Sequence, residues 1–185
     1  MIVRVALGVA VVFACVMATG ALHGQRAVDA MSLHEDGIGP MRLGSDFDEA
    51  ERLAFRVAGE SAFTGVGCAG FDEIRYGGTL GELAVGVMAM TGGDRIFTVE
   101  VTLQQPATAR THDECLALRD RFAEPFLVRY GDFEACWQVS KPVSRETLAR
   151  TGPVLIEARW FDSGGDCYIS ARYGDPRAAD GVRSP

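Results

Sequence analysis

The residues of this 185-residue chain that could do chemistry are few, and its cysteines come first. Four of the five cysteines lie beyond residue 21, namely Cys68, Cys115, Cys136 and Cys167. No two of them have C-x-x-C spacing and no histidine lies at ligand spacing from them, so we expect no metal site. We expect two structural disulfides, for which four cysteines allow three connectivities. Cys115 lies on the apolar face of a predicted helix and Cys167 shares a strand face with Ile169 and Ala171, which favours a bond between these two and leaves Cys68 with Cys136.

No complete catalytic constellation is present in the sequence. Residues 59–63 contain Ser61 but lack the last glycine of a G-x-S-x-G motif. His34 falls in a predicted lead-in and His112 at a predicted helix start, so neither is placed to activate a serine. The paired carboxylates lie in first helical turns or on opposite faces of a strand, which singles out no acid–base pair. We therefore expect no enzymatic activity, with a small envelope hydrolase using acidic residues as the alternative.

Residues 65–70 match the G-x-G-x-x-G pattern of dinucleotide-binding loops. That mechanism needs a preceding strand and a following helix, whose N-terminus binds the pyrophosphate. Here the sequence predicts a helix before the pattern and a strand after it. We therefore interpret the segment as a connection and expect no cofactor.

Three strand residues form the candidate binding face. Arg159, Tyr168 and Arg172 are predicted to share the solvent face of two paired strands. Arginine and aromatic side chains on an exposed sheet are typical of protein-binding surfaces. Cross-strand stacking and charge balance against Glu100 and Glu157 is the alternative explanation.

Two capping signals open the helices that must support these residues. Ser45-x-x-Asp48 starts one helix, which runs to about residue 58, and Thr111-x-x-Glu114 starts the other. Pro125 is expected to end or kink the second helix.

Alternating apolar residues and glycine-rich turns predict the strands. They are expected over 71–76, 83–90, 95–103, 133–139, 154–161 and 167–173. Gly77 and Gly78 are expected to stop the first strand, and Trp137 is expected to point inward. The order helix, strand, hairpin thus occurs twice. We expect a single α+β domain over 37–173, with an antiparallel sheet of about six strands and two helices on one face. The repeated order suggests a duplicated unit.

The N-terminus predicts export from the cytosol. Arg4 is followed by an uncharged apolar run over 5–22, and small residues crowd 18–21, as in a secretory signal peptide. We expect a signal peptide over 1–21, a flexible lead-in over 22–36 and a disordered tail over 174–185. The expected location is periplasmic or secreted. An inner-membrane anchor formed by residues 5–22 is the alternative, and only in that case would the protein contact a membrane.

The charge of the chain excludes some partners. The net charge is −7, and loss of residues 1–21 with Arg4 would make it −8. An acidic protein of this kind is not expected to bind nucleic acid. Another protein or an envelope component is the expected partner, and the sequence leaves the oligomeric state open.

Residues 37–44, GIGPMRLG, precede the first capped helix. This phrase resembles the opening of exported bacterial proteins of unknown function, which carry G-[IL]-G-P-x-[RK]-L-G, although Ser45 stands where methionine is usual. The helix-plus-sheet order is similar to small outer-membrane-assembly lipoproteins and to the repeats of β-lactamase-inhibitor proteins. No functional residue carries over. The expected function is a non-enzymatic binding or inhibitor-type module of the bacterial envelope, with an immunity protein to a secreted toxin as a further alternative.

Overall fold

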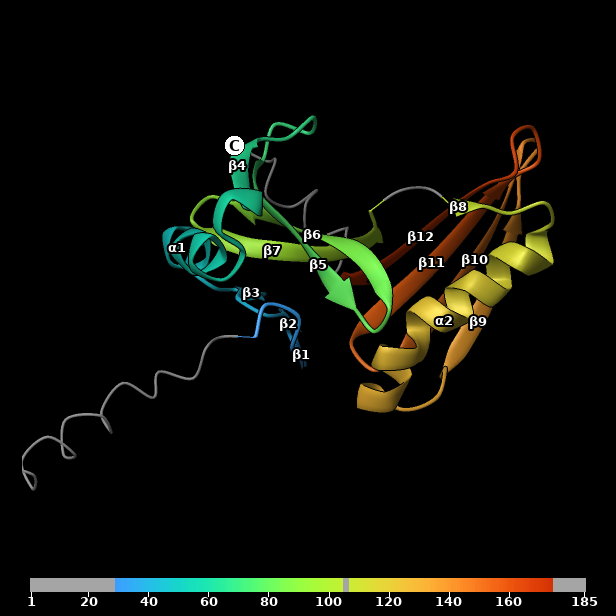
Figure 1. Cartoon of the computed structure of the whole chain (residues 1–185), viewed down its shortest axis with the longest axis horizontal. Helices are drawn as coiled ribbons and strands as arrows, with labels where there is room; N and C mark the ends of the chain where they lie inside the picture. The colour runs from blue at the N-terminus through green and yellow to red at the C-terminus, as the bar shows by residue number, and fades with distance from the viewer. Residues whose placement is uncertain (1–28, 105–106, 175–185) are drawn as a thin grey trace, which may run out of the picture.

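The computed structural model of the protein describes residues 29–104 and 107–174. The predicted signal peptide and all but the first residue of the predicted tail lie outside the described residues. The described part is α+β, as expected, but its main sheet holds nine strands and not about six (Figure 1). The helices are α1 (Phe47–Ala58), a short 3-10 helix η1 (Gly59–Ser61) and α2 (His112–Tyr130).

Two four-stranded meanders build the main sheet. The first contains β4 (Phe63–Val66), β5 (Asp72–Leu80), β6 (Leu83–Gly92) and β7 (Arg95–Leu103). The second contains β9 (Ala135–Ser140), β10 (Ser144–Thr151), β11 (Val154–Phe161) and β12 (Asp166–Tyr173). Their last strands pair, which gives the order β4-β5-β6-β7-β12-β11-β10-β9, and β8 (Ala107–Thr108) adds to β12. Each half is therefore one helix followed by four antiparallel strands.

The sequence-based prediction missed one strand in each half. These strands are β4 in the first half and β10 in the second. Strand β5 also runs through Gly77 and Gly78 to Leu80, so the expected stop at these glycines is wrong. A Cβ atom at Gly78 would lie 2.6 Å from the sulfur of Met31. Gly78 therefore leaves room for the Met31 side chain to pack on β5, and it does not end the strand.

The two helix starts are close to the expected ones. Asp46, one residue after Ser45, caps α1 by accepting a hydrogen bond from the backbone N–H of Glu49 at 3.1 Å. The predicted cap of α2 is confirmed, because the Thr111 hydroxyl accepts from the backbone N–H of Glu114 at 3.2 Å. Pro125 does not end this helix, which continues to Tyr130.

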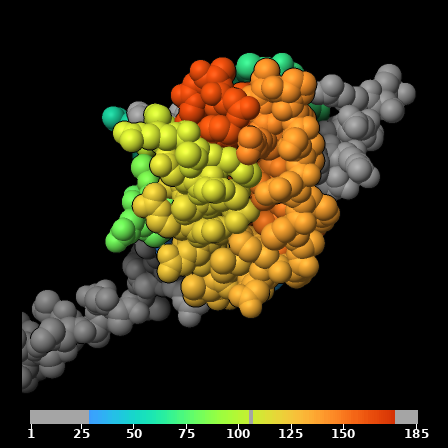
Figure 2. Space-filling view, turned by 90° about the vertical axis from the view of Figure 1, so that its right-hand side faces the viewer, coloured from blue at the N-terminus to red at the C-terminus, as the bar shows by residue number. Residues whose placement is uncertain are grey.

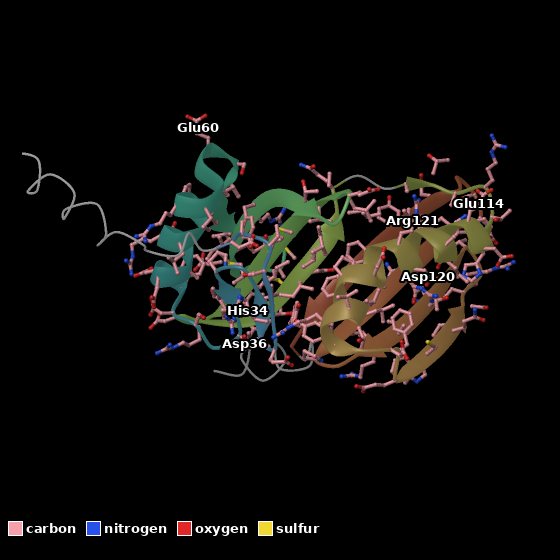
Figure 3. The ribbon with its side chains drawn as sticks, turned by 60° about the horizontal axis from the view of Figure 1, so that its bottom comes forward. His34, Asp36, Glu60, Glu114, Asp120 and Arg121 are labelled. Atoms are coloured by element: carbon pink, nitrogen blue, oxygen red, sulfur yellow. A yellow bond between two sulfur atoms is a disulfide. The ribbon has the colours of Figure 1, made fainter. Side chains whose placement is uncertain are left out.

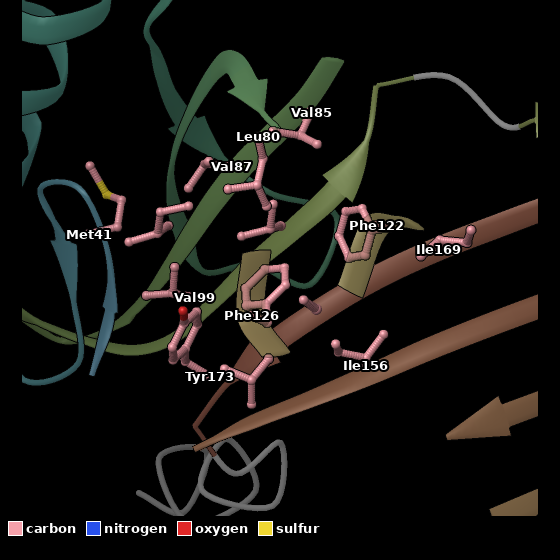
Figure 4. Close-up of a cluster of buried hydrophobic side chains, with 14 of the residues drawn as sticks. Met41, Leu80, Val85, Val87, Val99, Phe122, Phe126, Ile156, Ile169 and Tyr173 are labelled. Atoms are coloured by element: carbon pink, nitrogen blue, oxygen red, sulfur yellow. The ribbon is translucent and has the colours of Figure 1, made fainter. Parts of the chain in front are cut away.

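One buried cluster joins both helices to the sheet. Ala50 and Ala54 of α1 lie in the same cluster as Phe122 and Phe126 of α2. Figure 4 shows the phenylalanines beside strand residues such as Tyr173 of β12. In Figure 2, α2 in yellow lies directly against the orange second meander. The opposite face of the sheet is left without a helix among the described residues.

A small N-terminal sheet packs against both halves of the molecule. It contains β1 (Leu33–His34), β2 (Gly37–Ile38) and β3 (Met41–Arg42). The Tyr76 hydroxyl donates to the carbonyl of Ala30 at 2.8 Å, and the Tyr130 hydroxyl donates to the carbonyl of His34 at 2.6 Å. Burial raises the pKa of the Tyr130 hydroxyl. The described part of the expected flexible lead-in over 22–36 is therefore held in place, because tyrosines of both halves donate hydrogen bonds to it.

Candidate functional site

The pairing register defines which side chains face away from the helices. Val101, Ala171 and Ile156 lie side by side on β7, β12 and β11, and all three are buried in the core. Side chains alternate along a strand, so their neighbours point to the opposite side of the sheet. We call this surface the open face and define it by Glu100, Thr102, Glu157, Arg159, Phe161, Tyr168, Ser170 and Arg172.

The predicted binding residues all lie on the open face. Arg159 of β11 pairs directly with Tyr168 of β12, and Arg172 lies two strand positions further on from Ser170. They border a hollow of about 470 Å³ at the junction of the two meanders. The centre of this hollow is occupied by Thr102 and Ser170, which pair with each other across β7 and β12. The hollow forms because two short side chains are surrounded by long ones.

Arg159 is held by carboxylates on two strands. Its Nη2 donates to Glu157 Oε1 at 2.7 Å, and its Nε lies 2.8 Å from Glu146 Oε1. Lys141 Nζ donates to the same Glu146 oxygen at 2.7 Å. The hydrogen bond from Lys141 and the nearby Arg159 hold the pKa of the Glu146 carboxyl below its ordinary value. The Arg159 guanidinium is therefore fixed in place at one side of the hollow.

Arg172 is held much more loosely than Arg159. Its only ion pair with a described residue joins Nη2 to Glu100 Oε1 at 3.6 Å, beyond hydrogen-bond distance, and the side chains are 27% and 17% exposed. Within the described ranges neither group has a hydrogen bond, and the hydroxyls of Thr102 and Ser170 beside them have none. Donors and acceptors that are free to bind therefore converge on the hollow.

An aromatic pair forms another wall of the hollow. The rings of Phe161 and Tyr168 meet edge to face, with 5.6 Å between their centroids. Tyr168 is 47% exposed despite its size. On the edge strand β9, Trp137 is 45% exposed and pairs with Leu148 on the same side of the sheet as Glu157. The expectation that Trp137 points inward is wrong, because its parity on β9 places it on the face opposite to α2.

The cysteines form one disulfide in the described structure and not two. The bond between Cys115 of α2 and Cys167 of β12 is confirmed, and both residues are fully buried. Cys68 and Cys136 are free and exposed, so their expected pairing is wrong. Cys68 follows β4 and Cys136 lies on β9, which are the two opposite edges of the sheet. Seven strand spacings, roughly 34 Å, separate these edges.

The other candidate residues do not assemble into a site. Residues 65–70 comprise the last two residues of β4 and the start of its connection to β5, and a strand follows them instead of a helix. The His34 ring bonds to the Ser32 hydroxyl at 2.9 Å, and burial lowers its pKa. The His112 ring lies 6.1 Å from that of Trp160. Figure 3 shows Asp36, Glu60 and Glu114 in separate parts of the molecule.

The alternation of side chains along a strand is enough to place Arg159, Tyr168 and Arg172 on one face. The same alternation predicts that Arg159 lies near Glu157 and that Arg172 lies near Glu100, as the two ion pairs show. Sequence reasoning missed the contribution of Glu146, because β10 was not recognised as a strand. The signal available for this strand is the alternation of residues 144–151, whose inward positions after Arg145 are Thr147, Ala149 and Thr151.

The described residues contain no group of three or more histidine, cysteine or acidic side chains that could hold a metal ion. None of their helices combines the length and apolar character needed to cross a membrane. Comparison with protein-family models, with curated proteins and with solved structures finds no match for this chain.

Proposed function

We propose that this protein is a non-enzymatic binding module of the bacterial envelope and that another protein docks on its open face. The observation that carries the proposal is the hollow at the junction of β7, β12 and β11. It gathers an exposed tyrosine, two arginines and the hydroxyls of Thr102 and Ser170 over the middle of the sheet. Such a combination of an aromatic wall and convergent polar groups is what anchors a protein partner.

The arrangement of charges supports binding over catalysis. Arg159 is engaged by Glu146 and Glu157, which fixes the rim of the hollow before a partner arrives. Preformed surfaces of this kind lose little conformational entropy on association. The two carboxylates that line the hollow, Glu157 and Glu100, each form an ion pair with an arginine.

The disulfide supports the proposed location outside the cytosol. Cys115 and Cys167 are joined in the core, between α2 and β12, where the bridge fixes the helix against the sheet. Stable structural disulfides are characteristic of oxidising compartments. The proposed location is therefore the periplasm or the exterior of the cell.

Site-specific photo-crosslinking tests the proposed function. A benzophenone amino acid replaces Tyr168 on the open face or, as a matched control, Val128 on α2, which is 83% exposed. In the bacterium that encodes the protein, we expect a discrete crosslinked protein from position 168 and none from position 128. The purified partner should then lose at least about tenfold in affinity for Tyr168→Ala and keep its affinity for Val128→Ala. Equal crosslinking from both positions, none from position 168, or an unchanged affinity would overturn the proposal.

A further inference from the structure

Glu100 and Arg172 lie side by side in the hollow, and neither side chain forms a hydrogen bond with another described residue. Arg172 has five N–H donors, and the carboxylate of Glu100 has only acceptors. The two residues are direct cross-strand neighbours, yet Arg172 Nη2 and Glu100 Oε1 are 3.6 Å apart. A guanidinium and a carboxylate that lie side by side without a hydrogen bond can each still bind a third group.

We propose that this pair binds a primary carboxamide, the side chain of an asparagine or glutamine on a loop of the partner protein. The inference rests on the proposed function, because it names the group that the partner inserts. A carboxamide carries one acceptor and one donor side by side. Its oxygen accepts from the Arg172 guanidinium while its NH₂ donates to the Glu100 carboxylate.

Charge complementarity selects the amide over its charged relatives. A carboxylate would bond to Arg172 but would be repelled by Glu100, and an ammonium would bond to Glu100 but would be repelled by Arg172. Both groups are largely buried, which limits the screening of these repulsions by water. The neutral amide satisfies both groups and leaves neither with a like charge.

The surroundings of the pair suit such a side chain. The hydroxyls of Thr102 and Ser170 lie on the next row of the open face, where they can bond to the remaining amide hydrogen or oxygen. Beyond them, the rings of Phe161 and Tyr168 offer an apolar wall to the neighbouring residue of the partner loop. The hollow thus pairs one polar end with one aromatic end.

Three probes with one carbon skeleton test the proposal on the purified protein. They are 3-phenylpropanamide, 3-phenylpropanoate and 3-phenylpropylamine, titrated separately while NMR follows the backbone amide signals of Thr102 and Ser170. We expect the amide to bind with a dissociation constant on the order of a few millimolar. We expect the acid and the amine to bind at least about tenfold more weakly.

Variants of the pair should reverse this preference. Glu100→Gln removes the repulsion of carboxylates, so the acid should become the tightest of the three probes. Arg172→Gln should favour the amine in the same way. Arg150→Gln removes an exposed arginine of β10, outside the hollow, and should leave the preference for the amide unchanged.

The proposal is overturned if the unaltered protein prefers the acid or the amine, or if no probe shifts the Thr102 and Ser170 signals up to about 30 mM, well above the expected constant. It is equally overturned if Glu100→Gln keeps the preference for the amide. These outcomes are independent of the crosslinking result. A failed crosslink with an intact amide preference would refute the docking of a protein, whereas a specific crosslink without that preference would refute only the carboxamide.

Discussion

Removal of the Cys115–Cys167 disulfide should lower the free energy of unfolding by about 4 kcal/mol. The bridge joins residues that are 52 positions apart in the chain. In the chain-entropy treatment, cross-linking a loop of this length removes about 14 cal/mol/K from the entropy of the unfolded chain, which is about 4 kcal/mol at room temperature. We therefore expect Cys115→Ala/Cys167→Ala to unfold at a urea concentration about 2 M lower than the unaltered protein.

Two controls separate the loop from the lost sulfur atoms. Both cysteines are fully buried, so alanine at these positions also leaves small cavities, which add about 1 kcal/mol. Unfolding of the unaltered protein with and without a reducing agent measures the loop contribution alone. Cys68→Ser/Cys136→Ser changes two exposed, free cysteines and should alter the free energy of unfolding by less than about 0.5 kcal/mol.

Either of two results would refute this reasoning. A loss below about 1 kcal/mol on reduction would mean that the bridge does not constrain the unfolded chain as its span requires. A comparable loss in Cys68→Ser/Cys136→Ser would mean that these two cysteines are bridged as well. Peptide mapping under non-reducing conditions identifies the bridged pair directly.

Three further predictions test other parts of the structure. Tyr130→Phe removes both hydrogen bonds of a partly buried hydroxyl and should cost about 1–3 kcal/mol of unfolding free energy, measured by urea denaturation. Gly165→Ala and Gly93→Ala both place a side chain at positive φ, with φ of 68° and 67°, but only the former meets a backbone oxygen, at 2.8 Å. Gly165→Ala should therefore be the more destabilising by at least about 1 kcal/mol, and equal losses would contradict the structure. Lys141→Met should raise the pKa of Glu146 toward its ordinary value of 4.5, seen in a carboxyl NMR titration. Because the folded pKa lies below the unfolded one, the stability from this group is lost as the pH falls below 4.5, and the variant should lose less.

Strong periodic signals explain what the sequence could predict. The hairpins β6–β7 and β11–β12 combine clean alternation with glycine-rich turns, and both were expected nearly to their observed bounds. A period of two fixes the face of every residue once the strand is known. The shared face of Arg159, Tyr168 and Arg172 follows from this period. The position of Cys167 on the other face, which packs against α2, follows from it as well.

Weak signals explain what the sequence could not predict. The inward positions of β10 include Thr147, Ala149 and Thr151, which are buried but are not large apolar residues. Strand β4 has four residues and contains Gly65, so it lacks a recognisable pattern as well. Both segments become strands because they pair with their neighbours in the meander, β4 with β5 and β10 with β9 and β11, and this pairing overrides their weak local preferences.

The wrong cysteine pairing comes from the order of the strands and not from their number. The shared faces of Cys115 and Cys167 favoured their bond, and Cys68 and Cys136 were paired only because they remained. No local pattern in the sequence fixes the order of distant strands, and this order places β4 and β9 at opposite edges of the sheet. Cys68 follows β4 and Cys136 lies on β9, so the two thiols are too far apart to form a bond.

The same topology makes the hollow a property of the joined halves. Glu100 and Thr102 belong to the first meander, whereas Ser170 and Arg172 belong to the second. They come together only because β7 pairs with β12, the single pairing between the two meanders. The first half supplies the acceptor, Glu100, and the second half supplies the donor, Arg172, so one half alone cannot form this pair. If the two halves arose from one repeated unit, the binding site is a feature that the duplication created and that a single unit could not have possessed.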